Sequence, residues 1–192
     1  MNLLQDIIMV NRNVFRKSIQ SFKTSWVIVF TGLAYMIIGV FMAITINVLL
    51  RGILSILAGI ATLIVGSSLI SNYLYLLYNI INYDRITVDD FKNGFKYFIR
   101  KIYGVFFIAW IGSYFLSIVL NAIGSNAILI NRVIGIVILV ALNPLPEIIY
   151  QRHYSSGDSI KYALGFMEEN WLNWLLPNAI FHFILYLITN TL

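Results

Sequence analysis

The residues best suited to chemistry in this sequence are a histidine and two asparagines near prolines. His182 lies about 16 Å into the last charge-free run at 1.5 Å per helical residue, close to the midplane if that run spans a membrane. Asn178 follows Pro177, and Asn143 precedes Pro144. Transporters build sites from interrupted helices, so these residues are candidates for a midplane polar site. The favoured interpretation is a neutral histidine hydrogen-bonded within packed helices, with the prolines shaping the packing.

Catalysis is not expected from the remaining candidates. Residues 66–68 (Gly-Ser-Ser) fit the loose Gly-x-Ser pattern of rhomboid proteases, but the only deep base, His182, lies three predicted spans later. We interpret this stretch as a helix-packing position. Glu168 and Glu169 have no companion histidine pair, so no metal site is expected. With no cysteine and no phosphate-binding loop, the sequence predicts no cofactor and no enzyme activity.

The composition excludes a soluble domain. Only 11% of the 192 residues are charged and 60% are hydrophobic, whereas soluble domains have about 25% charged residues. Eight acids and thirteen bases cannot cover a globule of this size. A soluble enzyme, a disordered chain and a nucleic-acid-binding module are therefore excluded. The net charge of +5 is interpreted as loops that face anionic lipid.

Charge-free runs predict five membrane spans. A span needs about 20 mostly apolar residues. The predicted spans cover residues 24–50, 52–83, 102–120, 128–150 and 171–192. Turn-forming residues at 121–126 separate the third span from the fourth, and Asn143-Pro144 should interrupt the fourth near its end. The expected fold is thus an all-α polytopic transmembrane bundle that forms one integral membrane domain.

The bases are distributed unevenly between the two ends of these spans. Eleven of the thirteen lie in the N-terminal segment and in the connections after the second and fourth spans. Arg51 and Arg132 are the two exceptions. By the positive-inside rule, the N-terminus should be cytoplasmic and the C-terminus outside, in a bacterial cytoplasmic membrane.

A shared pattern precedes the first, third and fifth predicted spans. Starting at Phe15, Phe91 and Ile160, an apolar residue is followed by a base, a small residue at +3, and apolar residues at +4, +7 and +11. This spacing predicts amphipathic interfacial helices. The small residue should allow close backbone approach. The internal repeat units would cover approximately residues 11–83, 87–150 and 156–192.

The third unit ends after one span, so a sixth span is missing from the expected hairpins. The open side of the bundle should be covered by a second copy, giving a homo-oligomer, or by a partner membrane protein. Bases on the predicted interfacial helices should contact anionic lipid or that partner. These bases are Arg16, Lys17, Lys92, Lys96, Arg100 and Lys101.

Three stretches carry a resemblance to a known family. They are residues 146–150 (Pro-Glu-Ile-Ile-Tyr), 155–164 (Ser-Ser-Gly-Asp-Ser-Ile-Lys-Tyr-Ala-Leu) and 169–174 (Glu-Asn-Trp-Leu-Asn-Trp). The pattern resembles the membrane domain fused to some bacterial glycerophosphodiester phosphodiesterases and related stand-alone membrane proteins of largely unknown function. The resemblance implies a six-span bundle with interfacial helices. The sequence departs from it in lacking the sixth span and the phosphodiesterase domain, so that activity is not implied.

Two functions are therefore expected as alternatives. The first is a non-catalytic integral membrane protein that organises lipid or supports a partner membrane complex. The second is a transport subunit with a polar path around His182, in which Asn143 and Asn178 line the same path.

Overall fold

The chain folds into helices that follow the apolar runs of the sequence. The computed structural model describes residues 26–123 and 127–191 together with Met9, Arg12, Arg16 and Ile19, and it describes side chains up to residue 174 except those of Ile53 and Ile56. In chain order the elements are α2 (Val27–Leu49), the 3-10 turn η1 (Gly52–Leu54), α3 (Ser55–Tyr83), α4 (Val88–Tyr97), α5 (Ile99–Ile123), α6 (Ala127–Ala141), α7 (Leu145–Gln151) and α8 (Ser156–Thr191). The described residues contain helices and no strand, so the all-α class is confirmed.

Four stretches are long and apolar enough to cross a membrane. They are Val27–Leu49, Leu57–Tyr83, Val88–Ile123 and Ala127–Gln151. The first two lie within the first two predicted spans, and the last two contain the third and fourth predicted spans. The fifth predicted span lies in α8, largely beyond the described side chains. The length and composition of these helices point to a membrane protein.

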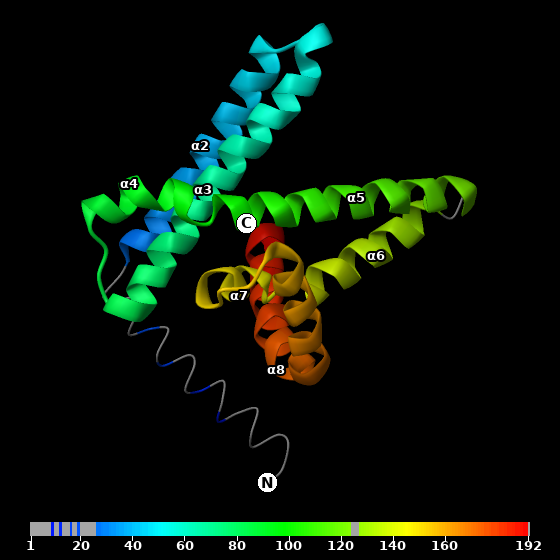
Figure 1. Cartoon of the computed structure of the whole chain (residues 1–192). Coiled ribbons are helices and arrows are strands. Elements are labelled where there is room, and N and C mark those ends of the chain that lie inside the picture. Colours follow the sequence, from blue (N-terminus) through cyan, green and yellow to red (C-terminus); the bar gives the residue numbers. More distant parts are fainter. Residues whose placement is uncertain are drawn as a thin grey trace.

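Two helical hairpins extend from a common region. The α2–α3 hairpin turns at η1, and α5 and α6 form the second hairpin. Figure 1 shows that the two hairpins point in different directions, so they do not pack side by side as the predicted bundle would. Their outward side chains are uncovered: Phe41 is 68% exposed, Trp110 66% and Ile136 64%. Surfaces this apolar are typical of contact with lipid or another protein.

The largest buried cluster lies where the hairpins meet. We call it the junction core, and α3, α5, α7, α8 and the residue between α4 and α5 contribute to it. Its buried members are Leu74, Phe98, Ile102, Leu145, Ile148, Ile149, Tyr150 and Ala163. Tertiary packing is therefore concentrated near one end of each hairpin (Figure 1).

Short polar motifs start the two helices that follow loops at the junction. Thr87 precedes α4, and its hydroxyl accepts from the Asp90 amide at 3.3 Å while the Asp90 carboxylate accepts from the Thr87 amide at 2.7 Å. Ser155 precedes α8, and its hydroxyl accepts from the Asp158 amide at 3.2 Å. These contacts satisfy amide groups that a helix start leaves unpaired. Asp90 and Asp158 thus lie in the first turns of their helices, where acidic residues are favourable.

The three segments predicted to be interfacial helices are not alike in the structure. The segment that starts at Phe91 is interrupted at Phe98, which separates α4 from α5. The segment that starts at Ile160 continues through Trp171 in α8 without a turn. The 36 residues of α8 extend about 54 Å, more than the roughly 30 Å of a membrane core. The segment that starts at Phe15 lies mostly outside the described residues.

The predicted interruption of the fourth span is confirmed. Helix α6 ends at Ala141, a turn covers residues 142–144, and α7 begins at Leu145. Pro144 lacks the amide hydrogen that would continue the helix. By contrast, α8 continues through Pro177.

Candidate functional site

Ser68, Ser71 and Asn72 form a polar stripe on one face of α3, next to the break between α4 and α5. The Ser71 hydroxyl donates to the Gly94 carbonyl at 2.7 Å and accepts from the Phe98 amide at 2.8 Å. The Ser68 hydroxyl donates to the Phe95 carbonyl at 3.3 Å. The last carbonyls of a helix and the first amides of the next have no partner within their own helices. Side chains of α3 therefore supply hydrogen-bond partners to backbone groups that have lost their helical partners at the break.

Asn72 extends this stripe to α2. Its side-chain amide donates to the Phe91 carbonyl, and its side-chain oxygen accepts from the Tyr35 hydroxyl at 2.9 Å. Asn72 and Ser71 are fully buried. One face of α3 thus binds α2 and α4. Residues 66–68 are predicted to be a packing position only, although polar residues at 68, 71 and 72 mark one helical face in the sequence.

The small residues of the repeated pattern lie at close contacts. At Gly94 an added Cβ would be 3.0 Å from Tyr75 Cδ1 and 3.1 Å from the Asn72 side-chain nitrogen. Ala163, the equivalent residue in α8, is fully buried in the junction core. The expected close approach therefore occurs at two of the three segments.

Three of the predicted lipid-contacting bases form an exposed group beside the junction core. We call Lys92, Lys96 and Arg100 the basic surface, and all three side chains are exposed. Lys92 lies 3.8 Å from the Asp89 carboxylate, but both side chains face solvent and such a pair contributes little. Arg16 is also exposed, whereas Lys17 lies outside the described residues.

Lys101 differs from the other predicted bases because its ammonium group is used within the chain. It donates to the Arg152 carbonyl at 2.8 Å and to the Ile149 carbonyl at 3.4 Å. It also lies 5.7 Å from the centroid of the Phe98 ring. Cations are favourable at a helix C-terminus, so Lys101 fastens α5 to the end of α7.

The predicted midplane site is described in part. Asn143 lies in the turn between α6 and α7, and its side-chain oxygen accepts from the Trp174 indole of α8. Asn178 and His182 follow one and two turns further along α8, and their side chains lie outside the described part. The structure therefore brings one of the three predicted residues to the helix that carries the other two.

A cavity of about 190 Å³ lies between α7 and α8. Its lining residues are Pro144, Glu147, Ile148, Gln151, Arg152, Tyr162, Phe166 and Trp174. Glu147 Oε2 is buried and has no hydrogen-bond partner. This cavity is not predicted from the sequence, although Glu147 and Trp174 both lie in the stretches that carry the family resemblance.

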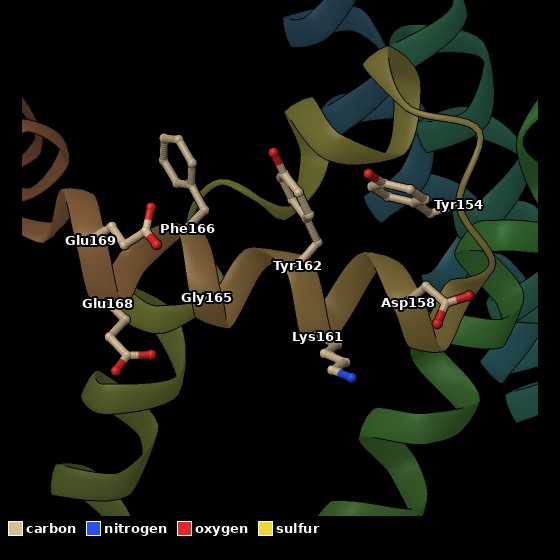
Figure 2. A pocket seen from close by; sticks show the side chains of 8 residues that line it. All are labelled: Tyr154, Asp158, Lys161, Tyr162, Gly165, Phe166, Glu168 and Glu169. Carbon is tan, nitrogen blue, oxygen red and sulfur yellow. The ribbon is translucent and has the colours of Figure 1, made fainter.

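A larger cavity, of about 610 Å³, borders the first part of α8. Figure 2 shows that Tyr162 and Phe166 project to one side of the helix, whereas Lys161 and Glu168 project to the other. The charged groups therefore do not converge on a common point. Among the described residues, no group of three His, Asp or Glu side chains could hold a metal ion.

No protein-family model, curated protein or solved structure matches this chain. The resemblance to the glycerophosphodiester phosphodiesterase membrane domain stays a prediction. The fold itself places the chain in a class, that of helical membrane proteins, on the length and exposure of its apolar helices.

Proposed function

We propose that this chain is a non-catalytic integral membrane protein that organises anionic lipid at the cytoplasmic face and can present the same surface to a partner membrane protein. The separation of charge supports the proposal. The basic surface lies beside the junction core, while Arg51 and Arg132 lie near the far turns of the two hairpins. Because the cytoplasmic leaflet is anionic, the junction end of the hairpins is assigned to the cytoplasmic side.

Hydrogen bonds from α3 position the basic surface. Ser71 and Asn72 bind α4, which carries Lys92 and Lys96, and Ser71 also binds the Phe98 amide next to α5, which carries Arg100. Each base near an anionic surface contributes about 1 kcal/mol. The three together are sufficient to enrich anionic lipid around the protein.

Replacement of all three bases of the basic surface by glutamine tests this proposal. The variant K92Q/K96Q/R100Q should lose at least about fivefold of its preference for phosphatidylglycerol over phosphatidylcholine, because the surface attraction is lost. The preference can be measured in vesicles as quenching of tryptophan fluorescence by brominated lipids of each type. The preference for phosphatidylglycerol should fall as salt is raised, and the difference between the variant and the unmodified protein should shrink with it.

The matched control changes the two bases at the opposite ends of the hairpins. The variant R51Q/R132Q should keep the lipid preference when only the leaflet at the junction end contains brominated lipid. Equal losses in the two variants, or no loss in either, would contradict the proposal.

The transport alternative is favoured by one observation. The span that contains α6 and α7 is interrupted at Asn143, whose side chain contacts Trp174 of α8. Interrupted helices in membranes supply polar groups to bound substrates and ions. On this alternative, Asn143, Asn178 and His182 line a polar path.

Replacement of His182 tests the transport alternative. In vesicles that contain the purified protein, His182→Ala should reduce proton or cation flux at least about tenfold if the path depends on this ionisable group. Flux can be followed with a pH-sensitive dye inside the vesicles. Absence of flux with the unmodified protein, or an unchanged rate in the variant, would rule out this path.

A further inference from the structure

Glu147 and Arg152 line the same small cavity but are not paired with each other. Glu147 Oε2 is buried without a hydrogen-bond partner, and among the described residues the two side chains form no ion pair. The Arg152 guanidinium instead lies 6.0 Å from the centroid of the Tyr162 ring. A buried carboxylate oxygen without a partner is costly, so a cavity of this kind favours a ligand that supplies a cation.

Aromatic rings form much of the remaining wall. Tyr162, Phe166 and Trp174 all line the cavity, and the Phe166 and Trp174 rings meet edge to face at 5.5 Å. Aromatic faces attract alkylammonium groups. A carboxylate beside them can accept charge-assisted hydrogen bonds from the ammonium group. The cavity volume of about 190 Å³ equals that of about six water molecules, enough for an ammonium group and its carbon substituents.

We propose that this cavity binds the headgroup of a zwitterionic phospholipid, with Glu147 and the aromatic rings holding the ammonium group and Arg152 holding the phosphate. The separated acid and base match a headgroup that carries both charges. The site is distinct from the basic surface, which lies on α4 and α5 and attracts net negative charge. A divalent cation fits less well, because Glu147 is the only carboxylate among the described side chains that line the cavity.

The experiment compares two lipids on the full chain. Protein purified in mild detergent is titrated with dioleoylphosphatidylethanolamine or dioleoylphosphatidylglycerol, and native mass spectrometry gives the bound fractions. Glu147→Gln should weaken phosphatidylethanolamine binding about tenfold, since it removes the charge that faces the ammonium group. Phosphatidylglycerol binding should change by less than about twofold.

Two further variants keep the test decisive. Glu168→Gln removes an acid that projects from the other side of α8 and should leave both affinities unchanged (Figure 2). Phe166→Leu keeps the apolar volume but removes the ring, and should weaken phosphatidylethanolamine alone about threefold. If Glu147→Gln weakens the binding of both lipids equally, the Phe166→Leu result decides. A loss of phosphatidylethanolamine binding alone upholds the site, and an equal loss for both lipids or no loss overturns it.

Free phosphoethanolamine, added at millimolar concentration to the lipid-bound protein, shows whether the site recognises the headgroup alone or the whole lipid. Displacement of the lipid assigns recognition to the headgroup itself, and retention with the Glu147→Gln effect intact assigns it to the intact lipid. Both results uphold the site. Phosphatidylethanolamine binding that is the same in Glu147→Gln and in the unmodified chain overturns it.

Discussion

Replacement of Ser71 by alanine should lower the free energy of unfolding by about 2–4 kcal/mol. The Ser71 hydroxyl is the partner of two buried backbone groups, the Gly94 carbonyl and the Phe98 amide. Alanine fits the space but removes the partner of both groups, and each unsatisfied buried group costs about 1–3 kcal/mol. The Gly94 carbonyl and the Phe98 amide are four residues apart, so they can recover part of this cost by pairing with each other. The loss can be measured by reversible unfolding in mixed micelles, followed by circular dichroism.

Ser113→Ala is the matched control for Ser71→Ala. The Ser113 hydroxyl donates to the Ala109 carbonyl within α5 and is exposed. The Ala109 carbonyl belongs to an intact helix and keeps its backbone partner. Loss of the Ser113 hydroxyl should therefore cost less than about 0.5 kcal/mol. Equal effects of the two substitutions would show that α3 does not support the break between α4 and α5.

Replacement of Gly104 by valine should cost about 1–3 kcal/mol and separate α5 from α8. A Cβ at residue 104 would clash with Ser156, because it would lie 2.3 Å from the Ser156 hydroxyl oxygen and 2.9 Å from the Ser156 Cβ. The Ser156 hydroxyl also donates to the Lys101 carbonyl at 2.9 Å, and this bond would be displaced. Thermal unfolding in detergent, followed by size-exclusion chromatography, measures the change.

Gly112→Val separates this clash from the general effect of valine in a helix. Gly112 lies in the same helix, and nothing lies within 4 Å of a Cβ at that position. Valine there should change the melting temperature only slightly. A loss at Gly112 as large as the loss at Gly104 would contradict the close contact between α5 and α8.

The sequence predicts the apolar helices well because their limits have a local cause. The charge-free runs 24–50 and 52–83 correspond closely to α2 and α3. Charged residues and turn formers end such helices, and both features are visible without any knowledge of the fold. The interruption at Asn143-Pro144 is predictable for the same reason.

The breaks at the junction depend instead on distant residues. The chain around Phe98 contains no proline, and its interruption is supported by Ser71, 27 positions earlier in the sequence. The passage from residue 156 to Trp171 and beyond shows the opposite case. An amphipathic pattern followed by an apolar one is compatible with either a turn or one continuous helix, and α8 is continuous.

The candidate sites divide in the same way. Exposed bases of the basic surface follow directly from charge counting. The internal role of Lys101 was missed because its partners, the carbonyls of Ile149 and Arg152, lie about fifty residues away. Arg152 could be expected to pair with Glu147, five positions earlier. It lies beyond the end of α7 in an extended conformation and is directed to Tyr162 instead.

The central proposal is that the junction faces the cytoplasm and the hairpin turns face the opposite side. The natural sequence contains no cysteine, so single cysteines can be placed without a background signal. Suitable positions are Lys96 and Arg152 at the junction end, and Arg51 and Arg132 near the hairpin turns. All four residues are exposed.

The most direct measurement is the reaction of these four variants with a membrane-impermeant maleimide in sealed vesicles of known orientation. We predict that K96C and R152C react only from the cytoplasmic side, and that R51C and R132C react only from the other side. Reaction of R51C and K96C from the same side would contradict the account, because α3 would then not cross the membrane.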